Sequence, residues 1–245
     1  MKKNVVINSI RMNLDLSEGI QKGMSAGTYE PEQTSWFKQC LKAGDVVVDV
    51  GASFGYYTTL GSYLVGSAGM VFAFEPSPVA SSVVEEAIVT SNVTNVLLTK
   101  AALGNQNAKI SLFLPNTSKL HSPSVLPSNN KFIPVKVPVI RLDEFKPLVS
   151  LDRNIKLVKI DVEGYEPNVL DGMSELILSG KVENIICEFN SGWLKLNSSN
   201  PKLLHDKFVG YGYKAIKKTK LRKNLPDSWG GVFSLQDIWF TRKGG

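Results

Sequence analysis

Hydrophobic and polar residues divide the first part of the chain into alternating segments of two kinds. Short apolar runs rich in β-branched residues, at 45–50, 71–74 and 96–100, are typical of buried parallel strands. Helices are predicted over 32–41, with Pro31 near the first turn, over 56–65, and from Pro78, which follows the capping residue Ser77. Strands that alternate with helices at this spacing predict right-handed βαβ units in a parallel sheet.

The middle of the chain departs from this pattern. Residues 109–114 and 135–140 are typical of strands, and the stretch between them is rich in Ser, Pro and Asn. A connection of this length is usually disordered or functional, for example as a lid over a site. We therefore expect an inserted hairpin and loop over residues 105–140.

The alternation then resumes as far as the end of the chain. It predicts strands at 156–161 and 184–189, a helix over about 167–178, a helix that begins at Asn200 and Pro201, and closing strands at 213–217 and 236–241. A length of 245 residues suits one large domain better than two. We expect a single domain over 1–245, in which residues 1–43 form an N-terminal helical cap.

Composition narrows the class of protein only a little. Apolar residues make up 43% and charged residues 20% of the chain, which excludes bulk disorder. The net charge of +6 favours an anionic partner, and nucleic acid, a phosphorylated molecule and an anionic membrane surface all remain open. No stretch approaches transmembrane length, and Asn8, Ser9 and Arg11 interrupt the first apolar run too early for a signal peptide. We expect a cytoplasmic protein.

A glycine-rich turn follows the first buried strand. Its spacing is Gly51-x-x-x-Gly55, and Asp49 stands two residues before the first glycine. A carboxylate there would repel a pyrophosphate, whereas it favours the sulfonium and ammonium groups of S-adenosylmethionine. Glu75 follows the second strand. A carboxylate at this place can accept hydrogen bonds from both ribose hydroxyls of a cofactor, as the corresponding acid does in NAD enzymes. The turn predicts a nucleoside-type cofactor, with the methyl donor favoured over NAD and a routine βα turn as the alternative.

Five segments, in order, resemble the FkbM-type methyltransferases: GDVVVDVGASFGYYT at 44–58, AFEPS at 73–77, AALG at 101–104, RLDEF at 141–145 and KIDVEGYE at 159–166. The resemblance covers about residues 27–190, and the last segment is the most specific. One departure is Ser53, where Asn is frequent. The resemblance implies a Rossmann-like class I α/β fold with helices on both faces of a mostly parallel seven-stranded sheet, whose last strand is antiparallel. It also implies S-adenosylmethionine as donor, S-adenosylhomocysteine as product, and O-methylation of a sugar-containing or natural-product acceptor.

The same resemblance implies a set of donor-binding positions. They are Glu30, Asp49, Gly51, Ala52, Ser53, Phe54, Gly55, Tyr57, Thr58, Glu75, Pro76, Ser77, Ala101, Ala102 and Asp161.

Asp161 ends a predicted strand, and ligands of open α/β sheets lie beyond the carboxyl ends of the strands. We expect Asp161 to position or deprotonate the acceptor hydroxyl. Lys159 lies on the same face of the strand and could tune the charge of Asp161, while Glu163 could bind the acceptor or the donor's amino group. The alternative is that Lys159 and Asp161 form an ion pair with a purely structural role at the end of the strand. Asp161 and Glu163 could also hold a divalent ion, but the spacing shows no third ligand, so no metal is predicted.

Other residues are weaker candidates for the acceptor site. His121 lies near Ser118 in the long loop and is an alternative general base, whereas His205 falls in a helix, where a packing or surface role is favoured. Glu188 and Asn190 end the next strand, and Trp229 could stack on a sugar ring. Six basic residues stand between Lys214 and Lys223 and could border the site. These basic residues suit an anionic glycan or a phosphorylated sugar as acceptor. Two alternative functions remain: an RNA 2′-hydroxyl methyltransferase, and a protein that binds the cofactor without catalysis.

Overall fold

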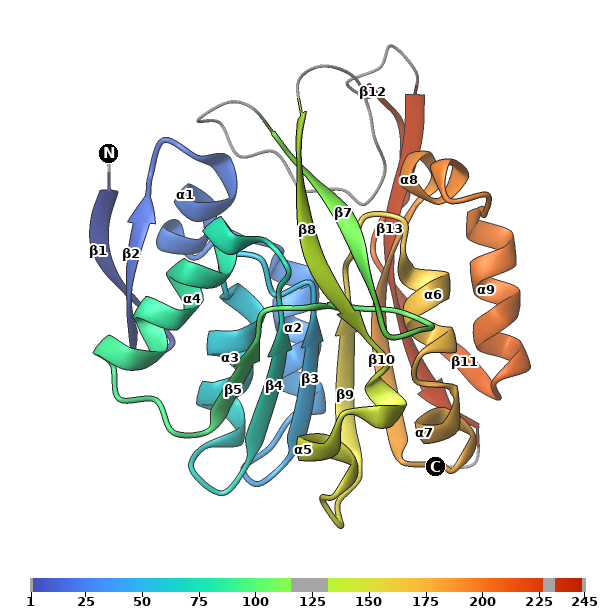
Figure 1. Ribbon diagram of the computed structural model, residues 1–245, viewed down its shortest axis with the longest axis horizontal. Coiled ribbons are helices and arrows are strands. Elements are labelled where there is room, and N and C mark those ends of the chain that lie inside the picture. Colours follow the sequence, from blue (N-terminus) through green and yellow to red (C-terminus); the bar gives the residue numbers. More distant parts are fainter. Residues whose placement is uncertain (1, 116–131, 227–231, 244–245) are drawn as a thin grey trace.

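The computed structural model describes residues 2–115, 132–226 and 232–243 (Figure 1). Its central sheet has the strand order β11-β13-β10-β9-β3-β4-β5, and β12 (Arg222–Pro226) adds a short eighth strand on β13. The seven strands of the main path are β3 (Val46–Val50), β4 (Met70–Phe74), β5 (Val96–Thr99), β9 (Ile155–Ile160), β10 (Val182–Asn190), β11 (Tyr213–Lys218) and β13 (Val232–Arg242). Only β13 runs antiparallel to its neighbours in this path. The predicted mostly parallel sheet with an antiparallel last strand is confirmed.

Helices cover both faces of the sheet, because successive residues of each buried strand point to opposite sides. Val46, Val48 and Val50 pack against one apolar cluster and Val47 against the other. The second cluster includes α2 (Pro31–Cys40) and α3 (Tyr56–Val65). The first includes α5 (Lys146–Val149), α6 (Glu166–Asp171), α7 (Ser174–Leu178), α8 (Ser191–Leu196) and α9 (Pro201–Gly210).

The predicted N-terminal helical cap is wrong for the first part of the chain. Residues there form a hairpin of β1 (Lys2–Ile7) and β2 (Ile10–Asp15), which precedes α1 (Gly19–Ala26). Ile10, Met12 and Leu14 alternate with more exposed residues, which is the period of a half-buried strand. Their apolar face packs on α4 (Pro78–Thr90), so tertiary contacts stabilise a hairpin that is too short to be stable alone.

The predicted helix over 167–178 is interrupted. It divides into α6 and α7 at Gly172, where an added Cβ would lie 1.9 Å from the carbonyl oxygen of Gly104. This close approach joins the helix pair to the inserted segment.

The insertion rises over the carboxyl ends of the central strands (Figure 1). It is a three-stranded sheet in the order β6-β8-β7, formed by β6 (Ala102–Leu103), β7 (Ala108–Pro115) and β8 (Phe132–Ile140). Strands β7 and β8 pair antiparallel as a hairpin.

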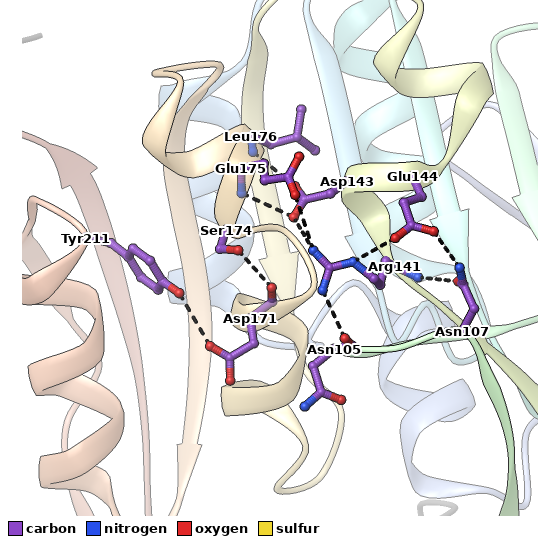
Figure 2. A network of polar contacts seen from close by, with 10 residues as sticks. All are labelled: Asn105, Asn107, Arg141, Asp143, Glu144, Asp171, Ser174, Glu175, Leu176 and Tyr211. Carbon is purple, nitrogen blue, oxygen red and sulfur yellow. Dashed lines mark hydrogen bonds and ion pairs between the residues drawn. The ribbon is translucent and has the colours of Figure 1, made fainter.

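A polar network fixes the base of this hairpin (Figure 2). Arg141 donates to the carbonyl of Asn105 at 2.9 Å and pairs with Asp143 at 3.1 Å. Asp143 lies in the short 3-10 helix Leu142–Glu144, and its carboxylate accepts from the backbone N–H groups of Glu175 and Leu176 at the start of α7. The RLDEF segment therefore anchors the insertion to the rest of the domain.

Candidate active site

A cavity of about 660 Å³ lies where the carboxyl ends of β3, β4, β9 and β10 meet the insertion. Most of the predicted site residues line it, and they converge from four strands and the loops that follow them. Those residues are Glu30, Asp49, Gly51, Ala52, Ser53, Phe54, Tyr57, Glu75, Pro76, Ser77, Ala102, Lys159, Asp161, Glu163 and Glu188.

The glycine turn brings β3 and β9 unusually close together. Gly51 has a φ of +81°, and an added Cβ would lie 1.9 Å from the carbonyl oxygen of Asp161. Its backbone N–H and that of Ala52 both donate to the Phe74 carbonyl at 3.0 Å. Glycine is therefore required both by the left-handed backbone and by the contact with the next strand.

Two backbone N–H groups orient the Glu75 carboxylate so that it can accept hydrogen bonds from hydroxyl groups. One carboxylate oxygen accepts from the backbone N–H of Ser53 and the other from that of Ser77, each at 2.7 Å. Each oxygen keeps a further lone pair for a ligand. Burial raises the pKa of Glu75 to about 7, against the lowering effect of the two N–H groups. A buried acid with this geometry fits the ribose hydroxyls of a nucleoside cofactor.

Asp49 lies behind the turn, with its side chain buried. Its carboxylate accepts from the Thr58 hydroxyl at 2.6 Å. Burial raises the pKa of Asp49 to about 6, while Thr58 and Lys159 lower it. A carboxylate at this position fits a cationic ligand beside it.

A buried lysine joins two carboxylates at the next strand end. Lys159 is 1% exposed, and its Nζ lies 3.1 Å from Asp161 Oδ2 and 3.7 Å from Asp237 Oδ1. It also lies 5.4 Å from the centre of the Tyr57 ring, within range of a cation–π contact. Burial lowers the pKa of Lys159, but the surrounding carboxylates, Asp161 first, raise it well above its usual value. Lys159 therefore stays protonated.

Asp237 is a member of this network that the sequence reasoning missed. It is 4% exposed, lies on β13, and accepts from Gln33 Nε2 of α2 at 2.6 Å. An acid directly before the apolar run IWF of the predicted last strand was the available signal. Burial raises the pKa of Asp237, and Lys159 lowers it.

Three carboxylates meet at the end of the cavity formed by β9 and β10. Oxygen atoms of Asp161, Glu163 and Glu188 all lie within 4.8 Å of one another. Burial, followed by the charges of Asp161 and Glu163, raises the pKa of Glu188 well above its usual value. Such a set could hold a divalent ion, and Glu188 is the third carboxylate that spacing along the sequence did not reveal.

Glu166 supports the turn that carries two of these acids. One of its oxygens accepts from the backbone N–H groups of Val162 and Gly164, at 3.3 and 3.1 Å. Burial raises the pKa of Glu166 to about 7. The trailing Glu of the KIDVEGYE segment thus fixes the loop after β9.

Glu30 approaches the cavity from the segment before α2. Its carboxylate accepts from the Tyr57 hydroxyl at 2.6 Å, and burial raises its pKa. Its φ is +41°, an uncommon backbone conformation for a residue other than glycine. The N-terminal segment therefore contributes directly to the wall of the site.

Other predicted residues lie behind the cavity lining. Thr58 holds Asp49, and Gly55 faces Val84, whose side chain a Cβ would meet at 2.9 Å. Ala101 is buried beside the cavity without lining it. Asn190 caps α8 by accepting from the N–H groups of Gly192 and Trp193, so its side chain is already used in the fold.

The remaining candidates come from the long loop, from a helix and from the C-terminal part of the chain. His121, Ser118 and Trp229 lie outside the described residues. His205 packs its ring 5.7 Å from that of Phe240, as a packing role predicts. Among the described residues that line the cavity, none belongs to the basic segment between Lys214 and Lys223.

The strand order, the glycine turn and the acid after β4 together define a class: a Rossmann-like methyltransferase that depends on S-adenosylmethionine. Residues 49–215 match the model of the FkbM methyltransferase domain, and the chain belongs to this family. The predicted resemblance is confirmed.

Sequence identity to an individual curated protein is low. The chain is 27% identical over 146 residues to Methyltransferase 1 of Beauveria bassiana (strain ARSEF 2860), a match that covers 53% of this chain and 58% of that protein. The match therefore spans little more than half of that relative's length.

A solved structure of an FkbM methyltransferase shows the likeness in fold. The FkbM methyltransferase of Methylobacillus flagellatus KT superposes with a TM-score of 0.50 at 13% identity, covering 88% of this chain and 52% of that one. M. jannaschii TYW2 in complex with AdoMet gives a TM-score of 0.47 at 16% identity, covering 98% and 86%. In the described part of the chain, no helix is long and apolar enough to cross a membrane.

Proposed function

We propose that this chain transfers the methyl group of S-adenosylmethionine to a hydroxyl oxygen of an acceptor that enters over β9 and β10. One observation carries the proposal. The Asp161 carboxylate, paired with buried Lys159, lines the same cavity as the Gly51 turn and Glu75.

The chain's own residues fit the donor. Glu75 would accept hydrogen bonds from the ribose hydroxyls, because two backbone N–H groups already fix the orientation of its carboxylate. The negative charge of Asp49 favours the donor's cationic groups. When bound, the donor supplies a methyl group activated by its sulfonium.

Asp161 acts on the acceptor. Its carboxylate accepts the hydroxyl proton as the new oxygen–carbon bond forms and the methyl–sulfur bond breaks, leaving the thioether S-adenosylhomocysteine. Lys159 holds the carboxylate in place from 3.1 Å, so that the hydroxyl is aligned with the methyl group. Glu163 and Glu188 lie beside this position, where their carboxylates would bind further hydroxyls of the acceptor.

A sugar-containing or natural-product hydroxyl suits this arrangement better than RNA. Nucleic-acid binding relies on Lys and Arg contacts to phosphates. The walls of the cavity, as far as they are described, carry acids and apolar side chains with Lys159 as the basic residue. The basic segment lies on β11 and β12, at the edge of the sheet.

Calorimetry and labelled methyl transfer test this function together. We expect S-adenosylmethionine and S-adenosylhomocysteine to bind and NAD not to bind. We expect label to enter glycan or small-molecule extracts and not RNA. The Asp161→Asn variant should lose at least a hundredfold in transfer while its affinity for S-adenosylhomocysteine is retained, because the loss of a general base costs about 10²–10⁴-fold. Full activity of Asp161→Asn, or tight binding of NAD alone, would contradict the proposal.

A further inference from the structure

The insertion presents a continuous aliphatic face to the cavity. Leu112 lies directly opposite Val135, and Leu114 directly opposite Ile133, in the antiparallel β7–β8 ladder. Residues that face each other in this way share one side of a hairpin. All four side chains line the cavity.

The facing wall is also apolar. Ile20 and Met24 of α1 and Val79 of α4 line the cavity from the other side. Ile133 remains 49% exposed and Val79 43% exposed, so aliphatic surface on both walls is left uncovered by the described chain. The polar groups gather at the strand ends below, which leaves a cavity with a charged floor and aliphatic upper walls.

The adenine ring of the donor is not the natural occupant of the upper walls. Val139 pairs with Ala102, which marks the level of the donor site near Glu75. Ile133 precedes Val139 by six residues, near the start of β8, which corresponds to about 20 Å of extended strand. Pro76, Ala102 and Leu103 already provide apolar surface for a base at the lower level.

The base of the hairpin that carries the upper wall is held in place by the fold. Arg141 and Asp143 anchor the base of the hairpin to the carbonyl of Asn105 and to the start of α7 (Figure 2). An anchored apolar wall can bind a ligand without first paying the entropy of ordering a loop.

We propose that the acceptor carries an aliphatic segment beside its reactive hydroxyl, and that Leu114, Ile133, Ile20 and Val79 bind this segment. The inference rests on the proposed function, since it assigns the upper cavity to the acceptor of that reaction. The chemistry recognised is a saturated carbon chain or ring, with the hydroxyl directed to the acids below.

A series of alkyl β-glucosides tests this inference by binding alone. Hexyl, heptyl and octyl glucosides, kept below their micelle concentrations, are titrated by calorimetry against the protein saturated with S-adenosylhomocysteine. Each added methylene should tighten binding by about two- to fourfold, the upper figure corresponding to full burial. The Ile133→Ser and Leu114→Ser variants should flatten this dependence while their affinity for S-adenosylhomocysteine is unchanged.

The matched control is Leu178→Ser, which alters an equally aliphatic residue on α7 that is 65% exposed and lies outside the cavity lining. It should keep the full dependence on chain length. A second variant, Ile133→Trp, narrows the cavity and should weaken octyl glucoside more than hexyl glucoside.

Two results would overturn the inference. One is equal or absent binding of the three glucosides to the unaltered chain. The other is loss of S-adenosylhomocysteine affinity in Ile133→Ser with the chain-length dependence intact, which would assign the wall to the donor. If the unaltered chain fails to bind S-adenosylhomocysteine, the proposed function fails instead. In that case the same glucoside titrations, done on the protein without S-adenosylhomocysteine, still test whether the aliphatic walls bind a carbon chain.

Discussion

Lys159 Nζ of β9 lies 3.7 Å from Asp237 Oδ1 of β13, and both side chains are buried. The two strands are not neighbours, since β10 lies between them in the sheet. The contact therefore links the last strand to the residue that holds Asp161. Gln33 extends the link to α2, so the N-terminal segment, the last strand and Asp161 in the cavity wall share one polar network.

Replacing Asp237 by Asn should weaken methyl transfer by about tenfold, equivalent to about 1.4 kcal/mol of transition-state free energy. The amide keeps the shape of the side chain but removes the charge that holds Lys159. Affinity for S-adenosylhomocysteine, measured by calorimetry, should stay within about twofold of the unaltered chain.

Asp206→Asn is the control for this variant, because Asp206 forms an exposed ion pair with Lys202. It should have no effect on transfer. Unaltered transfer in Asp237→Asn would show that the contact serves only the fold.

Replacing Lys159 by Met should destabilise the protein by about 3–5 kcal/mol, because it leaves buried carboxylates without their cation. The measurement is urea unfolding at pH 7. Lys202→Met removes a solvent-exposed cation and should change the free energy of unfolding by less than about 1 kcal/mol. A Lys159→Met protein as stable as the unaltered chain would argue against a charged, buried pair.

Glu75 should make the stability of the free protein depend on pH. Its pKa is raised by burial to about 7 from an ordinary value of 4.5, so the folded state holds a proton that the unfolded state releases. Stability is then greatest below pH 4.5 and falls as the pH rises through 7. The full effect is about 3 kcal/mol, at about 1.4 kcal/mol per unit of pKa.

Glu75→Gln should remove this component. The drop in unfolding free energy between pH 5 and pH 8 should be smaller in the variant by up to about 2.5 kcal/mol, since part of the effect already falls below pH 5. The variant should bind S-adenosylhomocysteine at least tenfold more weakly at pH 8. In the unaltered chain, that affinity should rise from pH 6 to pH 8 as Glu75 ionises. Parallel pH profiles of the two proteins would refute the assigned pKa.

Gly51→Ala should abolish donor binding and destabilise the fold. The added Cβ would lie 1.9 Å from the Asp161 carbonyl oxygen, a backbone atom that cannot move away without displacing β9. Gly212 provides a matched control, since its φ of +84° is similar and nothing lies within 4 Å of an added Cβ. Gly212→Ala should cost only the backbone strain of about 1–2 kcal/mol and keep donor affinity. Equal unfolding free energies for the two variants, measured in urea, would show that the contact with Asp161 does not matter.

The sequence by itself determined the seven strands in the main path of the central sheet, the glycine turn and the family, and it located Glu75 and Asp161 at strand ends. These features depend on short-range patterns: a buried parallel strand is a local apolar run, and the residues at its carboxyl end reach the site in any open α/β sheet. The N-terminal hairpin was missed because its alternating pattern is short and its apolar face is stabilised only by packing on α4.

Only the tertiary structure decided which side chains meet. Glu188 joins Asp161 and Glu163 because β10 pairs with β9, and Asp237 reaches Lys159 because β13 enters the sheet antiparallel. The aliphatic upper wall arises because the hairpin register places Leu114 opposite Ile133 and the anchored insertion directs that face inward. Contacts between residues far apart in the chain depend on strand order, register and direction, and no local pattern of residues encodes these.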